Sequence, residues 1–524
     1  MSAPSSAMSP GLVVLVLTLL LAIWGPEDML GPRAPGLSRA VRIFGEPVPQ
    51  YDLALIVIGP LVLALIWLVF NRTRWGVLVR AATEDREMVG ALGVNQRWLF
   101  TSTFMLGSFL AGLGGALQVP RESVSLLMDL SIIGEAFVVV VIGGMGSVSG
   151  AFVAAVIISV LNAFGVLVFP QISLVLPFLV MAVVLVVRPY GLFGTAASAH
   201  GAPTVPEAPL RPLPAAGIVV ATALFALLLA APAAGDTFLL VLLTDVLIAM
   251  VFAASLHFLM GVGGMVSFGH AAYFGLGAYA AAIAVRDLGL PMVPAMVFGP
   301  ITAALGALVF GWFCVRLSGV YLAMLTLAAA QILWGVTFQW QGVTGGDDGI
   351  LGIWPDRWAD GDAVFYYLAV GLCVGAIVLM RQLAHSPFGF ALRGGRDSPI
   401  RAEAIGIDLR AHQWLGFILA GTLAGLAGVV FVFSKGSVFP DALAIGQSID
   451  GLIMVLLGGV QALIGPILGA SAFILIEDWV TRLDYWRFIF GAIILVIVLV
   501  APDGIAGGLR RLGAVLRPAK GGAR

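Results

Sequence analysis

Long runs of uncharged apolar residues constrain the fold of this chain more than any other feature of its sequence. Four of the clearest runs are Leu53–Phe70, Phe152–Phe169, Leu174–Val187 and Phe488–Val500. The longer ones approach the ~20 residues that an α-helix needs to cross the hydrocarbon core of a bilayer. Over the whole chain only 10% of residues are charged, against about 25% in soluble domains. The sequence therefore predicts an all-α polytopic membrane protein.

Composition also limits the classes of function. The net charge is −1, so nothing suggests a nucleic-acid partner. Cys314 and Cys373 lie in apolar runs, and neither a disulfide framework nor a metal-ligand spacing is visible. The glycine-rich stretches "GGMGSVSG" and "GGVQALIG" lack the lysine of an ATP-binding phosphate loop. We therefore expect no catalytic residues, no metal, no bound cofactor and no enzymatic activity.

An alanine- and proline-rich stretch without apolar periodicity divides the chain. Residues 195–215 have the composition of a flexible linker, which we expect to be cytoplasmic. The predicted organisation is a first half at 1–194, this linker, a second half at 216–512 and a basic cytoplasmic tail at 513–524.

The two halves repeat one another in sequence. A shift of 313 residues places Gly76 on Gly389 and Arg80 on Arg393, and it places "ALGVN" at Ala91 on "AIGID" at Ala404. After a slip of two residues, "VVIGGMGSVSG" falls on "VLLGGVQALIG". Glycines in register over so long a stretch predict two homologous helical halves.

Each half contains one charged island between apolar runs. The islands are Arg80–Asn95 and Arg393–Asp408, and both are rich in arginine. Because short basic loops stay in the cytoplasm, we place both islands and the basic tail there. Arg33, Arg39 and Arg42 would then lie on the opposite side, which is the one observation against this orientation.

Capping rules predict a short helix in each island. An N-cap residue is followed by two helical turns and then by a glycine suited to the left-handed position after a helix. The predicted helices are Arg86–Leu92, between Asp85 and Gly93, and Pro399–Ile405, between Ser398 and Gly406. Each carries apolar residues, which a plain solvated loop would not need, so we interpret both as docking surfaces for a partner. The predicted docking residues are Glu84, Asp85, Arg86, Met88, Val89, Leu92, Gly93, Ser398, Pro399, Ile400, Arg401, Ala404, Ile405 and Gly406.

The motifs of both halves resemble a known family of transporters. The stretches "SLHFLMGVGGMVSFGHAAYFGLGAYAA" at Ser255, "TGGDDGI" at Thr344 and "SPFGFALRGGRDS" at Ser386 are similar to one member of the branched-chain amino acid permease pair of ABC importers. The stretch "RTRWGVLVRAATEDREMVGALGV" at Arg72 resembles the other member. The resemblance covers most of residues 216–510 and residues 52–194, as if two permeases were fused.

The resemblance implies a multi-pass subunit in the bacterial cytoplasmic (inner) membrane. It implies import of branched-chain amino acids by alternating access, driven by two separate cytoplasmic ABC ATPase subunits. These subunits would bind the ATP, and their movement would be transmitted to the membrane helices through the coupling helices 86–92 and 399–405. It also implies a periplasmic or extracellular substrate-binding protein. An importer of urea or short-chain amides is the close alternative, and a proton-coupled secondary transporter is a more distant one.

Ionisable and polar residues inside apolar runs are candidates for lining the transport pathway, because burying them is costly. A helix-end position or a packing role is the competing interpretation for each. The candidates are Glu135, Asp245, His257, Ser267, His270 and Asp450.

The first half has no counterpart of "SFGHAAYFGLGAYAA". Only 92 residues precede Gly93, whereas 169 residues separate Thr237 from Gly406. The first permease therefore looks truncated at its N-terminal side. Its opening helices would be missing, would lie upstream of a misassigned start, or would be supplied by another chain.

Overall fold

The structure of this chain is a computed structural model that describes residues 16, 19–25, 27–32, 34–43, 45–126, 128–194, 215–483, 486–501 and 503–515. Most of the predicted linker and tail lies outside these residues. The chain divides into two units, which are described separately. The smaller unit is Leu20–Phe164 with Tyr190–Gly201, and the larger unit is Met1–Leu19, Gly165–Pro189 and Ala202–Arg524.

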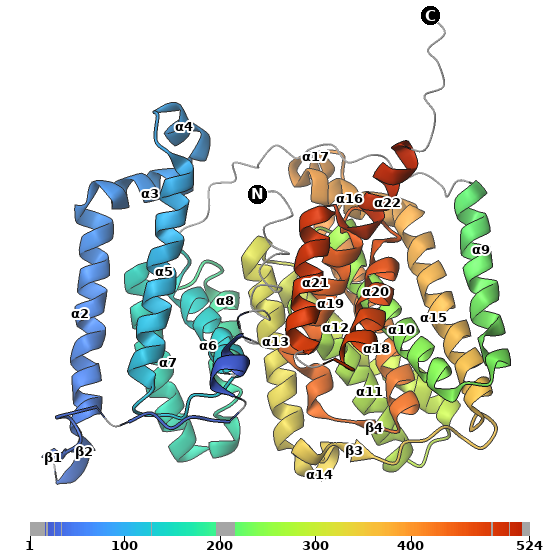
Figure 1. Ribbon diagram of the computed structural model, residues 1–524, viewed down its shortest axis with the longest axis horizontal. Coiled ribbons are helices and arrows are strands. Elements are labelled where there is room, and N and C mark those ends of the chain that lie inside the picture. The colour runs from blue at the N-terminus through green and yellow to red at the C-terminus, as the bar shows by residue number, and fades with distance from the viewer. Residues whose placement is uncertain are drawn as a thin grey trace, which may run out of the picture. The chain divides into compact units, whose positions relative to one another are not determined.

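Helices form nearly all of the regular structure in the described residues (Figure 1), which confirms the predicted all-α membrane fold. The apolar runs become eight helices there that are long and apolar enough to cross a bilayer. They are α2 Gln50–Arg72, α5 Gln96–Gln118, α7 Val148–Val168, α10 Thr237–His257 with its continuation to Val262, α12 Met292–Cys314, α13 Gly319–Gln339, α15 Asp362–His385 and α18 Leu409–Lys435.

The smaller unit buries few of its side chains. Besides α2, α5 and most of α7 it contains β1 Ala40–Ile43, β2 Glu46–Pro49, α3 Arg74–Glu84, α4 Arg86–Ala91 and α6 Met128–Gly143. Its strands pair antiparallel. Within α2 no residue is buried, and within α5 only Leu99 is. Leu99 packs with Ala82 and Val89 in a small apolar cluster where α3, α4 and α5 meet.

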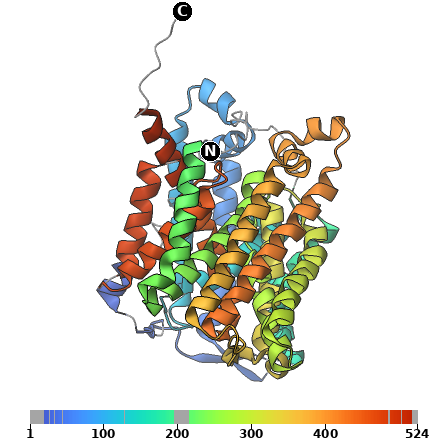
Figure 2. The ribbon, with the colours of Figure 1, turned by 90° about the vertical axis from the view of Figure 1, so that its right-hand side faces the viewer.

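The larger unit is a packed helical bundle (Figure 2). Its centre is α18, which lies against α11 Ala271–Arg286 and α12. Small residues allow this close approach, since a Cβ atom on Gly425 would collide with Ala303 and one on Gly428 with the carbonyl of Phe274. Its other elements are η1 Pro170–Ile172, α8 Leu176–Val187, α9 Ala215–Ala230, η2 Ala231–Ala234, η3 Phe258–Val262, α14 Gln341–Thr344, η4 Gly346–Asp348, β3 Ile350–Leu351, α16 Pro387–Asp397, α17 Pro399–Ala404, β4 Ser437–Val438, η5 Pro440–Leu443, α19 Ile445–Gly458, α20 Gly465–Val480, α21 Trp486–Val500 and α22 Gly504–Val515.

The internal repeat of the sequence has a counterpart in the elements of the two units. Helices α3 and α16 both have 11 residues, α4 and α17 both have 6, and the shift of 313 superposes their bounds. The Gly-Gly pairs end α6 and α19, and the second glycine of each pair is left-handed, with φ 97° at Gly144 and 106° at Gly459. The repeated glycines therefore mark the same turns in both halves.

Candidate functional site

The first candidate site is the turn formed by α3, α4 and the start of α5. Asp85 caps α4, because its Oδ1 atom accepts a hydrogen bond of 2.9 Å from the Met88 N–H. The helix ends at Ala91, one residue earlier than predicted, and Gly93 takes the left-handed conformation with φ 82°. Asn95 then caps α5. The predicted order of an N-cap, a short helix, a left-handed glycine and the N-cap of the next helix is confirmed here.

The second candidate site repeats this backbone in the larger unit. Pro399 is the first residue of α17, the helix ends at Ala404, and Gly406 has φ 89°. Asp408 caps α18 through a 3.1 Å hydrogen bond from the Ala411 N–H. Ser398 is the N-cap residue, as predicted, but its side chain accepts no hydrogen bond from the helix. Proline at the first position fixes a helical φ and starts α17 without it.

Each short helix, taken with the residue that follows it, buries one residue and exposes two large apolar ones. Val89 and Ala402 are each 4% exposed. Met88 and Leu92 are 58% and 75% exposed, and Ile400 and Ile405 are 82% and 77% exposed. Val89 was predicted to be a docking residue, but it faces inward to the small cluster. Exposed apolar residues beside exposed charges are typical of a protein-binding surface.

Arginine side chains tie both helix turns to the rest of their unit. In the smaller unit, the Arg86 Nε–H donates to Gln96 Oε1 at 3.1 Å, and its guanidinium lies 4.7 Å from the centre of the Phe100 ring. In the larger unit, Arg396 at the end of α16 donates to the Gly261 carbonyl and pairs with Asp397 at 2.8 Å. Movement of α17 would therefore reach the backbone after α10.

The chain after α10 interrupts its helix inside the bundle. Residues 258–262 form a π-helical turn, and the backbone stays non-helical until α11. Side chains from other helices satisfy this irregular backbone, as the bilayer interior demands. Thr326 Oγ1 accepts from the Phe268 N–H at 3.1 Å, and Ser448 Oγ accepts from the Ala271 N–H at 3.0 Å.

Three of the predicted pathway residues lie buried at or beside this interruption. His257 hydrogen bonds the Val460 carbonyl through Nε2 at 2.7 Å, and His270 Nε2 lies 2.8 Å from Ser255 Oγ. Ser267 and His270 are fully buried, and His257 is nearly so. Ser267 Oγ and His270 Nδ1 have no hydrogen-bond partner among the described residues. None of the three borders either of the cavities described below.

Two other predicted pathway residues, Asp245 of α10 and Asp450 of α19, meet in one cavity of the larger unit. This polar cavity has a volume of about 490 Å³ and is bordered by α10, α11, α18, α19 and α20. Lys435, at the end of α18, extends its Nζ atom to within 2.7 Å of Asp245 Oδ2. Glu477 of α20 also lines the cavity. Sequence reasoning missed Lys435 and Glu477, although both stand beside apolar runs as Asp450 does.

The sixth predicted pathway residue, Glu135, is in the smaller unit. Its side chain is exposed on α6. The repeat aligns it with Asp450, so equivalent positions in the two halves have different surroundings.

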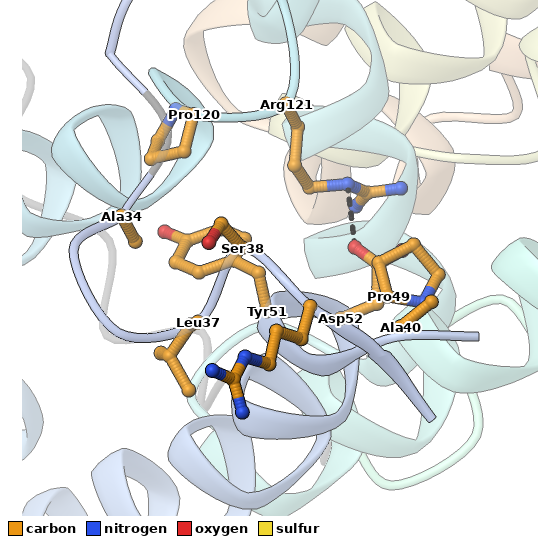
Figure 3. Close-up of a pocket in the computed structure, with 10 residues that line it drawn as sticks. Ala34, Leu37, Ser38, Ala40, Pro49, Tyr51, Asp52, Pro120 and Arg121 are labelled. Carbon is orange, nitrogen blue, oxygen red and sulfur yellow. Dashed lines mark ion pairs between the residues drawn. The ribbon is translucent and has the colours of Figure 1, made fainter. Parts of the chain in front are cut away.

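A cavity of about 370 Å³ lies in the smaller unit between the β1–β2 hairpin, the start of α2 and the end of α5 (Figure 3). An ion pair of 3.2 Å joins Arg121 to Asp52, and the Tyr51 hydroxyl donates to the Leu117 carbonyl at 2.7 Å. Both partners of the ion pair are well exposed, so the pair adds little stability. These contacts join the start of α2 to the end of α5 and present no reactive group.

The described residues contain no group of three or more His, Cys, Asp or Glu side chains that could hold a metal ion. Cys314 and Cys373 are free thiols buried in the bundle.

Comparison with known proteins gives one family and several relatives. The family model "Branched-chain amino acid transport system / permease component" matches residues 3–185 and again 238–498. The high-affinity branched-chain amino acid transport system permease protein LivM of Escherichia coli (strain K12) is 23% identical over 290 residues, which cover 50% of this chain and 68% of LivM.

Other relatives match a shorter part of the chain. The permease protein BraD of Pseudomonas aeruginosa, from a system of the same description, is 30% identical over 185 residues, which cover 33% of this chain and 59% of BraD. The probable branched-chain amino acid transport permease protein LivH of Methanocaldococcus jannaschii is 29% identical over 151 residues, covering 27% of this chain and 46% of LivH. The chain thus spans less than two thirds of the length of BraD and LivH.

Proposed function

Because this chain belongs to the family of branched-chain amino acid transport system permeases, we propose that it is the membrane-spanning subunit of an ATP-driven importer for branched-chain amino acids. The two matched segments support a permease with two related halves in one chain. We place it in the bacterial cytoplasmic membrane, where a substrate-binding protein delivers the amino acid from outside.

The duplicated short helices carry this proposal. Helices α4 and α17 share their length and their glycine stop, and each is accompanied by two exposed apolar residues, of which Leu92 and Ile405 are equivalent in the repeat. Two equal surfaces suit two copies of an ATPase subunit. The sequence has no phosphate-binding loop of its own, so these subunits would bind and hydrolyse the ATP.

The contacts behind the helices supply a route for coupling. An ATPase that moves α17 also moves α16, whose Arg396 holds the Gly261 carbonyl in the interrupted segment. That segment adjoins His257, which is hydrogen bonded to Val460 between α19 and α20. A displacement of α17 would therefore shift helices deep in the bundle, and alternating access needs such a change.

Uptake by reconstituted vesicles tests the proposal. The full chain, the ATPase subunits and the binding protein should together accumulate labelled L-leucine when ATP is supplied. Vanadate should stop this uptake, and a protonophore should leave it unchanged. The reverse pattern would show a proton-coupled transporter. Accumulation of urea or acetamide in place of leucine would assign the chain to the amide importers.

A further inference from the structure

The polar cavity lies at the end of the larger unit that is opposite to α17. Helix α18 starts just after α17 and has 27 residues, so its last residue Lys435 lies ~40 Å from its first, given a rise of about 1.5 Å per residue. Figure 1 shows α17 and β4, which follows Lys435, at opposite ends of this bundle. In the proposed orientation the cavity therefore lies on the outer side, where substrate arrives.

Charges in the cavity are only partly compensated. Lys435 pairs with Asp245 at 2.7 Å, and Asp478 pairs with Arg482 at 3.0 Å. Asp450 and Glu477 also line the cavity, and neither side-chain carboxylate makes a hydrogen bond or an ion pair to another described residue. Carboxylates beside a bilayer are costly unless a cation accompanies them. Within the described residues, no basic side chain thus forms an ion pair with Asp450 or Glu477.

Apart from the polar residues Gln447 and Thr481, the remaining wall of the cavity is apolar and aromatic. Four phenylalanines from four helices line it: Phe252, Phe274, Phe431 and Phe473. The rings of Phe252 and Phe274 lie 5.3 Å apart edge to face, and Phe431 lies 5.4 Å from Phe274. The volume of about 490 Å³ is within the range of ~300–1,000 Å³ for small-molecule sites. An apolar group of modest size would bury its surface here.

We propose that this polar cavity is a binding site for a single α-amino acid with an apolar side chain. Its ammonium group would supply the positive charge that pairs with Asp450 and Glu477. Its carboxylate would accept from Lys435, whose ammonium has three donors and uses one for Asp245. Its side chain would lie against the phenylalanines. Asp245 is then a positioning residue that holds Lys435 in place.

Other ligand classes leave parts of the cavity unexplained. An inorganic cation would use the carboxylates but neither Lys435 nor the four aromatic rings. A neutral amide would leave Asp450 and Glu477 without a counter-charge. Of these ligands, only a zwitterion with an apolar side chain uses the carboxylates, Lys435 and the aromatic rings together. The inference deepens the proposed function, on which its transport role rests.

Calorimetry on the purified full chain in lipid nanodiscs tests the site without the partner subunits. L-leucine should bind, whereas 3-methylbutylamine and 4-methylpentanoate, which each lack one charged group, should bind at least about tenfold more weakly. Acetamide should not compete. Equal affinity for leucine and the amine would show that Lys435 does not bind the carboxylate of leucine. Equal affinity for leucine and the acid would show that Asp450 and Glu477 do not bind its ammonium group.

Substitutions assign the binding to the cavity. Asp450→Asn, Glu477→Gln and Lys435→Met should each weaken leucine binding at least about tenfold. Lys435→Arg keeps the charge and should retain binding within a few fold, which separates loss of the site from misfolding. Asp360→Asn and Arg357→Met are matched controls, because both residues are exposed in the loop before α15 and outside the cavity. Unchanged affinity in the first three variants would show that leucine binds elsewhere.

Uptake separates this inference from the proposed function. If ATP drives leucine uptake and Asp450→Asn leaves the KM unchanged, the inference is wrong and the proposed function stands. If the chain binds leucine through the cavity but ATP never drives uptake, the inference stands and the proposed function is wrong.

Discussion

At the scale of single residues, the glycines after α4 and α17 are the clearest case of a residue type fixed by backbone conformation. Gly406 has φ 89°, and a Cβ atom added to it would meet nothing within 4 Å. Any effect of a side chain there is therefore backbone strain, without collision. Gly93 has φ 82° and equally open surroundings. The sequence predicted both glycines because this requirement is local.

Gly406→Ala should destabilise the turn between α17 and α18 by about 1–2 kcal/mol, because alanine in the left-handed conformation crowds its own carbonyl. Hydrogen exchange of the α17 amides should become several fold faster. Gly394→Ala is the matched control, since Gly394 is also in open space but has an ordinary helical backbone in α16. The control should slow exchange or leave it unchanged, and equal acceleration in both variants would contradict this account.

A second prediction concerns the fully buried His270. Ser255 donates its hydroxyl to the Phe252 carbonyl at 2.8 Å, so the same oxygen accepts from His270 Nε2–H. Ser255→Ala would leave this N–H without its acceptor and should destabilise the chain by about 1–3 kcal/mol. Thermal unfolding in detergent measures the loss.

Ser471→Ala is the control for Ser255→Ala. Its hydroxyl bonds only a carbonyl of its own helix, that of Ile467, at 2.6 Å. The control should lower the midpoint temperature of unfolding by far less than Ser255→Ala does. Similar shifts in the two variants would mean that the hydrogen bond between Ser255 and His270 contributes little to stability.

At the scale of helices, local chemistry predicted the ends of α4 and α17 to within one residue, since caps and glycine stops act over a few positions. The inward direction of Val89 escaped prediction because it depends on Ala82 and Leu99, which arrive from other helices. Sequence reasoning also could not predict that Asp245, Asp450, Lys435 and Glu477 lie together, because this too depends on how separate helices pack. These four residues come from α10, α19, α18 and α20, and no spacing along the chain brings them together.

Equivalent helices of the two halves differ in what covers their small residues. Gly425 of α18 faces Ala303 of α12 so closely that a Cβ atom would collide with it. Gly112 of α5 is its counterpart in the repeat, and no described atom lies within 4 Å of a Cβ atom added there. The same residue type is thus a packing contact in one helix and not in the other.

Gly425→Ala should destabilise the larger unit by about 1–3 kcal/mol, because α12 and α18 must separate or strain to admit the methyl group. Gly112→Ala should be neutral or slightly stabilising, since alanine favours a helix by about 1 kcal/mol over glycine. Unfolding by a graded denaturing detergent compares the two. A matching loss in Gly112→Ala would show that α5 is covered there by another chain in the sample.

At the scale of the whole molecule, the two halves are alike where they would meet ATPases and unlike where they would meet substrate. α3–α4 and α16–α17 agree in length and in the glycine that follows them, and both have an exposed apolar residue at the equivalent positions Leu92 and Ile405. In contrast, Asp450 lines a cavity with Lys435, whereas its counterpart Glu135 is exposed. Two ATPase subunits of one kind would need similar surfaces, and a single small substrate would not. We therefore expect both short helices to be required for transport, although each belongs to a different half.

Leu92→Asp and Ile405→Asp test this expectation, because each places a charge on one exposed apolar surface and should weaken one ATPase contact by at least about tenfold. Native mass spectrometry should then find one ATPase subunit per chain in either single variant, two in the unchanged chain and none in the double variant. ATP-driven leucine uptake should fall to background in all three variants. Leu92→Ile and Ile405→Leu keep the apolar surface and should retain two subunits and uptake. Two bound subunits in the double variant would move the ATPase contact away from α4 and α17.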